Sequence, residues 1–348
     1  MSITVALAGD TMLGRGVAER VSRSADLNDF FSGEMRDRLA GADFFLLNLE
    51  CCVSARGVLW DAPGKPFHFR APPQAAELLA GLGVGCVTLA NNHALDFGYD
   101  ALRDTRRHLD RVGIRCVGAG DGLAEARRPV EVTAGGLRLG IVACGDHPRD
   151  FAAAPHRPGI AHAALTDGVP PWLPAVIGEL RTRVDAVLVT PHWGPNMVGE
   201  PLPYVRAAAG ALVEAGATLV AGHSAHVFHG VAGRVLYDLG DFIDDYAVHP
   251  VLRNDLGLLW LVTLDQHGPV RLRALPLKLD YGRTRLAEGA DWCWVRDRLT
   301  LACARMGTSV SEDGREIVVE VGTGHGSGPA QDRGVSGRPG FRAGGGVG

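Results

Sequence analysis

The amino-acid sequence predicts an α/β fold, and three features support that prediction. Through the first two thirds of the chain, short runs rich in Val, Ile and Leu alternate with segments of helical periodicity. This alternation is typical of sheets whose strands are buried on both faces. From residue 233, strand-like runs follow one another without a long helix. A hydrophobic fraction of 46% is sufficient for a sizeable core.

Each expected strand is a short apolar run rich in β-branched residues. These runs cover residues 3–10, 43–50, 84–92, 114–118, 137–144, 185–192 and 217–222. Between them, apolar residues recur at spacings of three and four, which predicts helices over 75–82, 101–112 and 203–215. We interpret Asp96, Phe97 and Gly98 as a cap that leads into a helix over 99–111.

The last third of the chain is expected to add strands rather than a separate domain. The runs 233–239, 257–264 and 270–279 alternate with turns, and we expect them to complete a second sheet. A last helix is predicted over 287–306 and a final strand over 316–321. We therefore expect one domain over 1–321. The tail 322–348 consists mostly of Gly, Pro, Ser and Arg and is expected to be disordered.

Composition excludes several classes of function. Lys and Arg total 35 against 39 for Asp and Glu, so we expect no nucleic-acid partner. No run reaches the about 18 apolar residues of a membrane span, and the N-terminal run 3–8 lacks the features of a signal peptide. The seven cysteines show no CxxC spacing, which is typical of free thiols in a reducing compartment. We therefore expect a cytoplasmic protein.

Five apolar runs end in polar side chains, which packing alone does not explain. The polar endpoints are Asp10, Glu50, Asn92 with His93, His192, and His223 with His226. Because the carboxyl ends of parallel strands meet at one sheet edge, we expect these side chains to converge. Carboxylates, an amide carbonyl and neutral imidazoles are ligands for a divalent cation. Two such ions would require one carboxylate that bridges them.

The same residues carry a resemblance to a known family. The chain resembles the CapA group of poly-γ-glutamate capsule synthesis proteins, a branch of the calcineurin-like metallophosphoesterases. The resemblance spans roughly residues 3 to 280, and its matching segments are 9–12, 48–50, 69–73, 89–98, 191–197, 222–226 and 239–242. It implies a four-layer α/β/β/α sandwich of the metallo-dependent phosphatase type, with two mixed sheets flanked by helices.

The resemblance also implies roles for individual residues. Asp10, Glu50 and His226 would hold a first metal, and Glu50 as the bridge, Asn92, His192 and His223 would hold a second. His93 would act as general acid for a leaving group. Asp96 would either orient His93 or cap the following helix. One or two divalent ions are expected, with Mn²⁺ as the first choice and Zn²⁺, Fe²⁺ or Ca²⁺ as alternatives.

Two further pairs are expected to contact substrate. Arg15 and Arg70 could meet an anionic group, although a surface ion pair is the alternative for each. Asp146 and His147 follow the run 137–144 and would line a substrate cleft.

The chain departs from the phosphoesterase pattern at two positions, and from the CapA branch at one. Met12 occupies a position where a His ligand is usual, and Glu50 replaces the usual bridging Asp. Both departures are typical of the CapA branch. Asp241 stands where that branch has Asn, so it is either a surrogate ligand or a loop residue.

Three functions follow as hypotheses. The first is a metal-dependent hydrolase of a phosphoester or of an anionic peptide or polyglutamate-type polymer, in which metal ions lower the pKa of water and His93 protonates the leaving group. The second is an accessory role with capsule-synthesis partners, without hydrolysis. The third is metal-dependent peptide epimerisation. A metal-binding domain without activity is the remaining alternative.

Overall fold

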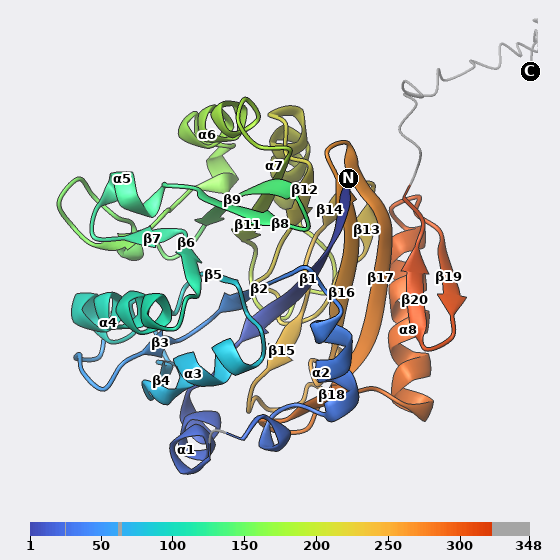
Figure 1. The fold of residues 1–348 in the computed structure, drawn as a ribbon, viewed down its shortest axis with the longest axis horizontal. Coiled ribbons are helices and arrows are strands. Elements are labelled where there is room, and N and C mark those ends of the chain that lie inside the picture. The colour runs from blue at the N-terminus through green and yellow to red at the C-terminus, as the bar shows by residue number, and fades with distance from the viewer. Residues whose placement is uncertain (25, 62–64, 322–348) are drawn as a thin grey trace, which may run out of the picture.

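The computed structural model describes residues 1–24, 26–61 and 65–321, which form a mixed α/β structure (Figure 1). The tail predicted to be disordered, residues 322–348, lies outside the described residues. No helix within the described ranges is long and apolar enough to cross a membrane.

The larger sheet contains ten strands, with the N-terminal strand near its centre. Strand β1 pairs in parallel with β2 on one side and antiparallel with β16 on the other. Along the main path the strands are β19 (Val310–Asp313), β20 (Glu316–Val319), β17 (Gly268–Leu279), β16 (Leu256–Asp265), β1 (Ser2–Thr11), β2 (Phe44–Leu49), β5 (Cys86–Thr88) and β6 (Arg115–Val117). In addition, β15 (Asp241–Ile243) pairs with β1, and β18 (Thr284–Leu286) pairs with β17.

The second sheet contains six strands, and its central strands are parallel to one another. Their order is β13 (Val231–Ala232), β14 (Val235–Leu236), β12 (Leu219–Ala221), β11 (Ala186–His192), β9 (Leu137–Gly145) and β8 (Val130–Ala134). Two short ladders complete the strand pairing: β3 (Cys52–Val53) with β4 (Arg70–Ala71), and β7 (Ala119–Gly120) with β10 (Gly159–Ile160).

The helices gather in groups around these sheets (Figure 1). They are α1 (Arg15–Arg23), α2 (Gly33–Ala40), α3 (Gln74–Gly81), α4 (Gly98–Arg111), α5 (Leu123–Ala126), α6 (Trp172–Leu180), α7 (Pro203–Glu214) and α8 (Gly289–Ala304). Three 3₁₀ helices span Leu27–Asp29, Arg149–Phe151 and Leu165–Asp167. Helices α1 to α4 pack on the larger sheet, α6 and α7 pack on the second sheet, and α8 contacts β16 and β17.

Buried apolar side chains form three large clusters, and the central strands contribute to two of them. In β1, Val5 and Leu7 belong to the cluster shared with the second sheet, whereas Ala6 and Ala8 belong to the cluster under α1 to α4. Strand β9 is also buried on both faces. Its Ile141 belongs to the cluster shared by the two sheets, whereas the β9 residues on the opposite face belong to the cluster that includes α6 and α7. Alternate side chains of a strand point to opposite faces. Burial on both faces therefore explains the continuous apolar runs of the sequence.

The α/β prediction is confirmed, with two local corrections. Each predicted strand of the first two thirds contains an observed strand, and α3, α4 and α7 match the predicted helices closely. However, the runs 257–264 and 270–279 do not complete the second sheet. They form β16 and β17 and extend the larger sheet, because β16 pairs with the side of β1 that β2 does not occupy, and β17 pairs with β16.

The second correction concerns the start of α4. Asp96 was expected to contribute to the helix cap, but the N-cap residue is Phe97 and no side chain caps the helix. The Asp96 carboxylate is instead bonded to His93 and to the Phe69 backbone N–H.

Candidate metal centre

The parallel strands of both sheets deliver the predicted residues to one edge. Asp10 lies at the end of β1, and Glu50 follows directly after β2. His192 is the last residue of β11 and forms an isolated β-bridge with His223, which follows β12. Convergence at the carboxyl ends of parallel strands is the usual position of a site in an α/β fold.

Asp10, His192 and His223 form one buried group whose ligand atoms all lie within 4.8 Å of one another. Asp10 Oδ1 is 3.9 Å from Nδ1 of each histidine. The two Nδ1 atoms are themselves 2.8 Å apart. Thr190 Oγ1 lies 2.9 Å from Nε2 of His223, which leaves its Nδ1 to face the group. This arrangement offers a carboxylate oxygen and two imidazole nitrogens to a single point.

Asp10 also belongs to a second buried group, with His226 and Asp241. His226 Nδ1 lies 3.4 Å from Asp10 Oδ2 and 2.8 Å from Asp241 Oδ1. Glu50 lies between the two groups, because its Oε1 is 3.8 Å from His192 Nε2 and its Oε2 is 3.9 Å from His226 Nδ1. Asp10 is thus common to both groups, and Glu50 reaches both.

The donor atoms of this cluster fit a cation. Within the described residues, both carboxylate oxygens of Glu50, Oδ1 of Asn92, Nε2 of His192 and Oδ2 of Asp241 are buried without a hydrogen-bond partner. A buried polar atom without a partner costs about 1–3 kcal/mol, so the four such atoms on Glu50, His192 and Asp241, which belong to one cluster, require an explanation. Coordination to divalent metal ions would satisfy the carboxylate oxygens, and it would engage His192 through one ring nitrogen, Nδ1 or Nε2, since a neutral imidazole has a single free lone pair in its ring plane.

The buried carboxylates of the cluster repel one another. Burial, reinforced by the charge of Asp10, raises the pKa of Glu50 well above its ordinary value. Burial and neighbouring carboxylates likewise raise the pKa of Asp241 and Asp238. For Asp10, burial raises the pKa although His226 and Asn48 oppose it. A divalent cation would relieve this repulsion.

The pKa values of the buried histidines shift in opposite directions. Burial lowers the pKa of His223 to about 3, and burial with the neighbouring histidines lowers the pKa of His192. Both imidazoles are therefore neutral near pH 7, which is the form that binds metals. Burial alone would lower the pKa of His226, but Glu50 and Asp10 outweigh it and raise the pKa.

His93 lies beside the cluster and is fixed by Asp96. Its Nε2 is 4.0 Å from Glu50 Oε1, and its Nδ1 is 2.5 Å from Asp96 Oδ2. Lys65 Nζ lies 2.9 Å from the other Asp96 oxygen and donates to the Asn92 carbonyl at 2.8 Å. Burial lowers the pKa of His93 to about 4, although Asp96 acts against this shift. The pair thus has the geometry of an oriented imidazole with its second nitrogen directed toward the cluster.

Sequence reasoning missed the residues that hold the ligands in place. Asn91 Nδ2 donates to Asn48 Oδ1 at 2.9 Å, and Asn48 Nδ2 donates to Asp10 Oδ1 at 2.7 Å. Asp238 accepts the backbone N–H groups of Ala225 and Gly240 and so fixes the loop before His226. Asn48 could have been found, because it shares a strand face with Glu50 at a spacing of two.

The predicted substrate residues separate into two sets. Asp146 is bonded to His147 and accepts from Tyr204 Oη at 2.9 Å, and the His147 ring lies 5.4 Å from the His192 ring. These two residues therefore lie beside the cluster. Arg15 also approaches it, since it lines a cavity together with His93 and His226. Arg70 does not line this cavity, because its guanidinium lies 4.2 Å over the Phe97 ring.

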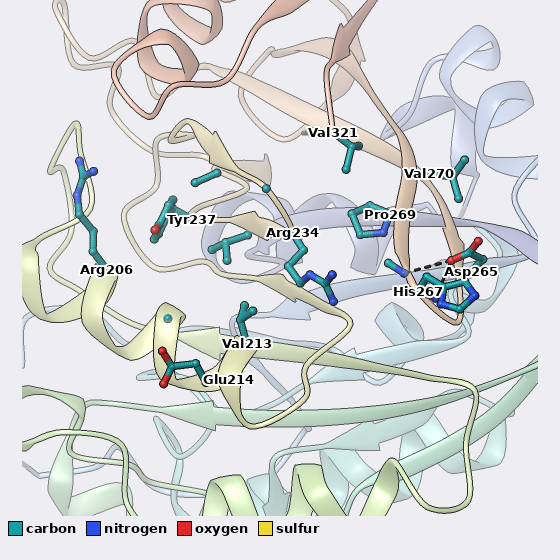
Figure 2. Close-up of a pocket in the computed structure, with 15 residues that line it drawn as sticks. Arg206, Val213, Glu214, Arg234, Tyr237, Asp265, His267, Pro269, Val270 and Val321 are labelled. Atoms are coloured by element: carbon teal, nitrogen blue, oxygen red, sulfur yellow. Dashed lines mark hydrogen bonds between the residues drawn. The ribbon is translucent and has the colours of Figure 1, made fainter. Parts of the chain in front are cut away.

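Two cavities differ in their relation to the cluster. The cavity lined by Arg15, His93 and His226 has a volume of about 510 Å³. A larger cavity of about 720 Å³ is lined by α7, the β13–β14 hairpin and the β16–β17 turn (Figure 2). It contains none of the predicted site residues, and its Asp265 accepts backbone N–H groups of its own turn. The smaller cavity is therefore the one that bears on the candidate site.

Comparisons with known proteins agree on one family. The family described as bacterial capsule synthesis protein PGA_cap matches residues 4–246. A probable polyglutamine synthesis accessory protein of Mycobacterium tuberculosis H37Rv is 33% identical over 88% of this chain and 93% of its own length. The PGA biosynthesis protein CapA of Bacillus subtilis 168 is 27% identical over 70% of this chain and 63% of its own. The capsule biosynthesis protein CapA of Bacillus anthracis is 26% identical over 83% and 70%, respectively.

Proposed function

This chain belongs to the PGA_cap family of bacterial capsule synthesis proteins, and from that membership we propose that it is a metal-dependent hydrolase. The observation that carries the proposal is the buried cluster of unpartnered ligand atoms around Asp10 and Glu50. We further propose that the sheets and helices form the four-layer α/β/β/α sandwich of the metallo-dependent phosphatases. The three large hydrophobic clusters support that architecture.

The proposed ligands form two sets that share Asp10. Asp10, His192 and His223 would hold one ion, and Asp10, His226 and Asp241 would hold the other. Glu50 reaches both sets, and Asn92 contributes its unpartnered amide oxygen. Divalent ions, with Mn²⁺ as the first choice, lower the pKa of water and neutralise developing negative charge when bound.

The chain's own groups supply orientation and a proton. Asp96 holds the Nδ1–H tautomer of His93, so that Nε2 faces the cluster. Burial lowers the pKa of His93 to about 4, so its protonated form is a minor population near pH 7. In that form, His93 would donate a proton from Nε2 to the departing oxygen or nitrogen. Lys65 holds Asp96 from the opposite side and ties it to the Asn92 backbone. The substrate would be a phosphoester or an anionic amide whose charge meets Arg15.

Metal content tests the coordination proposal before any substrate is known. Elemental analysis of the intact chain is expected to give two equivalents of metal, and His223→Ala is expected to lower this toward one. His267→Ala, a change of an exposed histidine on the β16–β17 turn, is the matched control. An intact chain that retains no divalent metal after loading contradicts the coordination proposal.

Hydrolysis is tested separately with the manganese-loaded protein. We expect cleavage of at least one phosphodiester, phosphomonoester or γ-glutamyl substrate, which chelation abolishes. If all three substrate classes remain intact although two metal equivalents are bound, the hydrolase proposal is wrong.

An accessory role in polyglutamate synthesis is the second candidate. It is favoured by the names of the relatives, a probable polyglutamine synthesis accessory protein in M. tuberculosis and a PGA biosynthesis protein in B. subtilis. In that case the site would bind a polyglutamate chain in company with synthesis partners and leave it uncleaved. Epimerisation would use nearly the same residues, and solvent deuterium in recovered peptide would distinguish it from hydrolysis.

A further inference from the structure

The cavity beside His93 and His226 has an apolar rim. Its lining comes from six separate parts of the chain: the start of α1, the segment before β4, the loops after β5, β11 and β12, and the loop between β15 and β16. The two histidines are buried, with relative exposures of 6% each, whereas Phe67 and Val248 are 57% and 53% exposed. The cavity therefore extends from solvent to the candidate metal centre.

Aromatic side chains form one wall over the whole depth of this cavity. The Phe67 and Phe69 rings stack at 6.3 Å, and Phe69 lies 4.2 Å from the His93 ring. Tyr246 continues the wall, at 5.7 Å from Phe69 and 5.3 Å from the His226 ring. Phe67 is 57% exposed whereas Phe69 is 2% exposed, so Phe67 supplies the apolar surface that an apolar ligand would cover. The wall is thus suited to an aromatic or branched aliphatic group.

Arg15 is the one permanently charged side chain among the described residues that line the cavity, since the other basic residues there are histidines. Among the described lining residues Arg15 is the arginine, and no carboxylate belongs to the lining. Its guanidinium lies 6.0 Å from the Phe69 ring and 5.9 Å from the Tyr246 ring. Asp245, whose side chain is 2% exposed, holds Arg15 Nε at 3.2 Å. This arrangement provides for a single anionic group rather than a series of them.

Like Arg15, which pairs with Asp245, the other arginines of helix α1 contact groups of the protein itself. Arg20 donates to the carbonyl groups of Asp29 and Gly282, and Arg23 pairs with Glu19 at 3.6 Å. A polyanion would require several cations that remain available for its charges. Arg20 and Arg23 line a separate cavity together with Arg15, and neither of them lines the cavity beside His93 and His226.

Three residues of the lining adopt strained backbone conformations. Arg15, Met197 and His226 have φ angles of 53°, 57° and 59°, in the left-handed region that favours glycine. Each such residue costs about 1–3 kcal/mol and is retained where the surrounding structure enforces it. Here, Asp245 holds Arg15, the Ala225 carbonyl accepts Met197 N–H, and Asp241 pairs with His226. The strain is concentrated around this cavity.

We propose that the cavity selects a substrate with an aromatic or branched aliphatic group that carries a single anionic group to Arg15. The apolar part would lie along Phe67, Phe69 and Tyr246, and the reacting bond would lie next to His93. The inference rests on the proposed function for the position of the reacting bond. The binding preference of the cavity is measured separately, with probes that are not turned over and in the absence of metal.

The test compares three small probes of similar length. They are 3-phenylpropanoate, which has an aromatic ring and one charge, glutarate, which has two charges, and 3-phenylpropanamide, which has none. Calorimetry or saturation-transfer NMR is carried out on the protein as purified and again in chelator. We expect 3-phenylpropanoate to bind about tenfold more tightly than either other probe in both conditions.

Variants assign the preference to this cavity. Phe67→Ala is expected to weaken 3-phenylpropanoate about fivefold and to leave glutarate unchanged. Arg15→Asn tolerates a left-handed backbone and should reduce 3-phenylpropanoate to the level of the amide. Leu301→Ala, a change of a 55% exposed apolar residue on α8, is the control and should have no effect.

Two outcomes would overturn the proposal. One is glutarate binding as tightly as 3-phenylpropanoate in chelator. The other is Phe67→Ala having no more effect than Leu301→Ala. Neither outcome alters the metal content or the hydrolysis of standard substrates, so failure here is distinguishable from failure of the proposed function.

Discussion

Asp10 is the residue around which the buried cluster is arranged. Its Oδ1 accepts from Asn48 at 2.7 Å and its Oδ2 accepts from the Ser224 backbone N–H at 3.2 Å. These bonds orient both oxygens, one toward His192 and His223 and the other toward His226. A carboxylate held from two sides by neutral donors keeps its geometry without a counter-charge, which suits a metal ligand.

At this scale we predict that His192→Ala and Asn92→Ala lower activity by more than about 100-fold. Each removes a proposed ligand and leaves the surrounding apolar core in place. Hydrolysis by the manganese-loaded protein measures the loss, and a thermal melt near that of the parent shows that folding is intact. Near-parental activity in either variant would exclude that residue from the metal centre.

Asp241 provides a second prediction, because its interpretation as a ligand and its interpretation as a loop residue predict different effects on metal affinity. As a ligand, Asp241→Asn should lower metal affinity about tenfold or more. The same change should raise the melting temperature in chelator, since it removes a buried carboxylate that repels Asp10 and Asp244. Metal titration and melting are measured together. If Asp241 is only a loop residue, metal affinity stays unchanged.

At the scale of elements, the contact between β1 and β15 brings Asp10 beside Asp241 in the candidate metal centre. The Asp10 backbone N–H donates to the Gly240 carbonyl at 2.9 Å, and Asp10 pairs with Asp241 in the parallel ladder. This approach is possible because residue 9 has no side chain. A Cβ at Gly9 would lie 1.8 Å from the Gly240 carbonyl oxygen.

We therefore predict that Gly9→Ala lowers the free energy of unfolding by about 3 kcal/mol and disrupts metal binding, because β15 must move away from β1. Gly210→Ala is the matched control, since Gly210 lies in α7 with no atom within 4 Å of an added Cβ. The control should be stabilised by about 0.5–1 kcal/mol. Urea unfolding of both variants checks the prediction, which fails if Gly9→Ala is as stable as the parent.

At the scale of the whole molecule, the two sheets are buried on both faces, and several titratable side chains are therefore buried away from solvent. His229 is one of them, and it is separate from the proposed ligands. Its Nε2 lies 2.7 Å from the Val198 carbonyl, and burial lowers its pKa to about 4. Unfolding restores a pKa of about 6.5, so the unfolded chain binds a proton first as the pH falls. His229 thus contributes stability that is present above pH 6.5 and is lost toward pH 4.

The test compares the parent with His229→Gln, whose amide can reach the same carbonyl. Between pH 6.5 and 4 the parent should lose up to about 1.4 kcal/mol per pH unit more than the variant. The quantity to measure is the difference in slope between the parent and His229→Gln. The cluster carboxylates with raised pKa change the free energy of unfolding in the opposite direction, and they do so in both proteins. His267→Gln, a change of an exposed histidine, should not show it. Equal slopes for His229→Gln and the parent would contradict the prediction.

The strands and the convergence of their polar ends could be predicted from the sequence, since both follow from local patterns. A strand buried on both faces requires a continuous apolar run, and a polar residue that ends such a run must lie at the sheet edge. Asp10, Glu50, His192 and His223 were found in this way, and the structure places them together. Their roles as ligands remain a prediction.

Only the tertiary structure decided which distant residues meet. The pairing of Asp241 with His226, the contact of Lys65 with Asp96 and the joining of β16 to β1 connect segments that no local pattern relates. The same applies to Arg15, which lines the cavity, and Arg70, which stacks on Phe97 instead. Local periodicity determines which face of an element is buried, whereas the neighbour on that face depends on the packing of the whole chain.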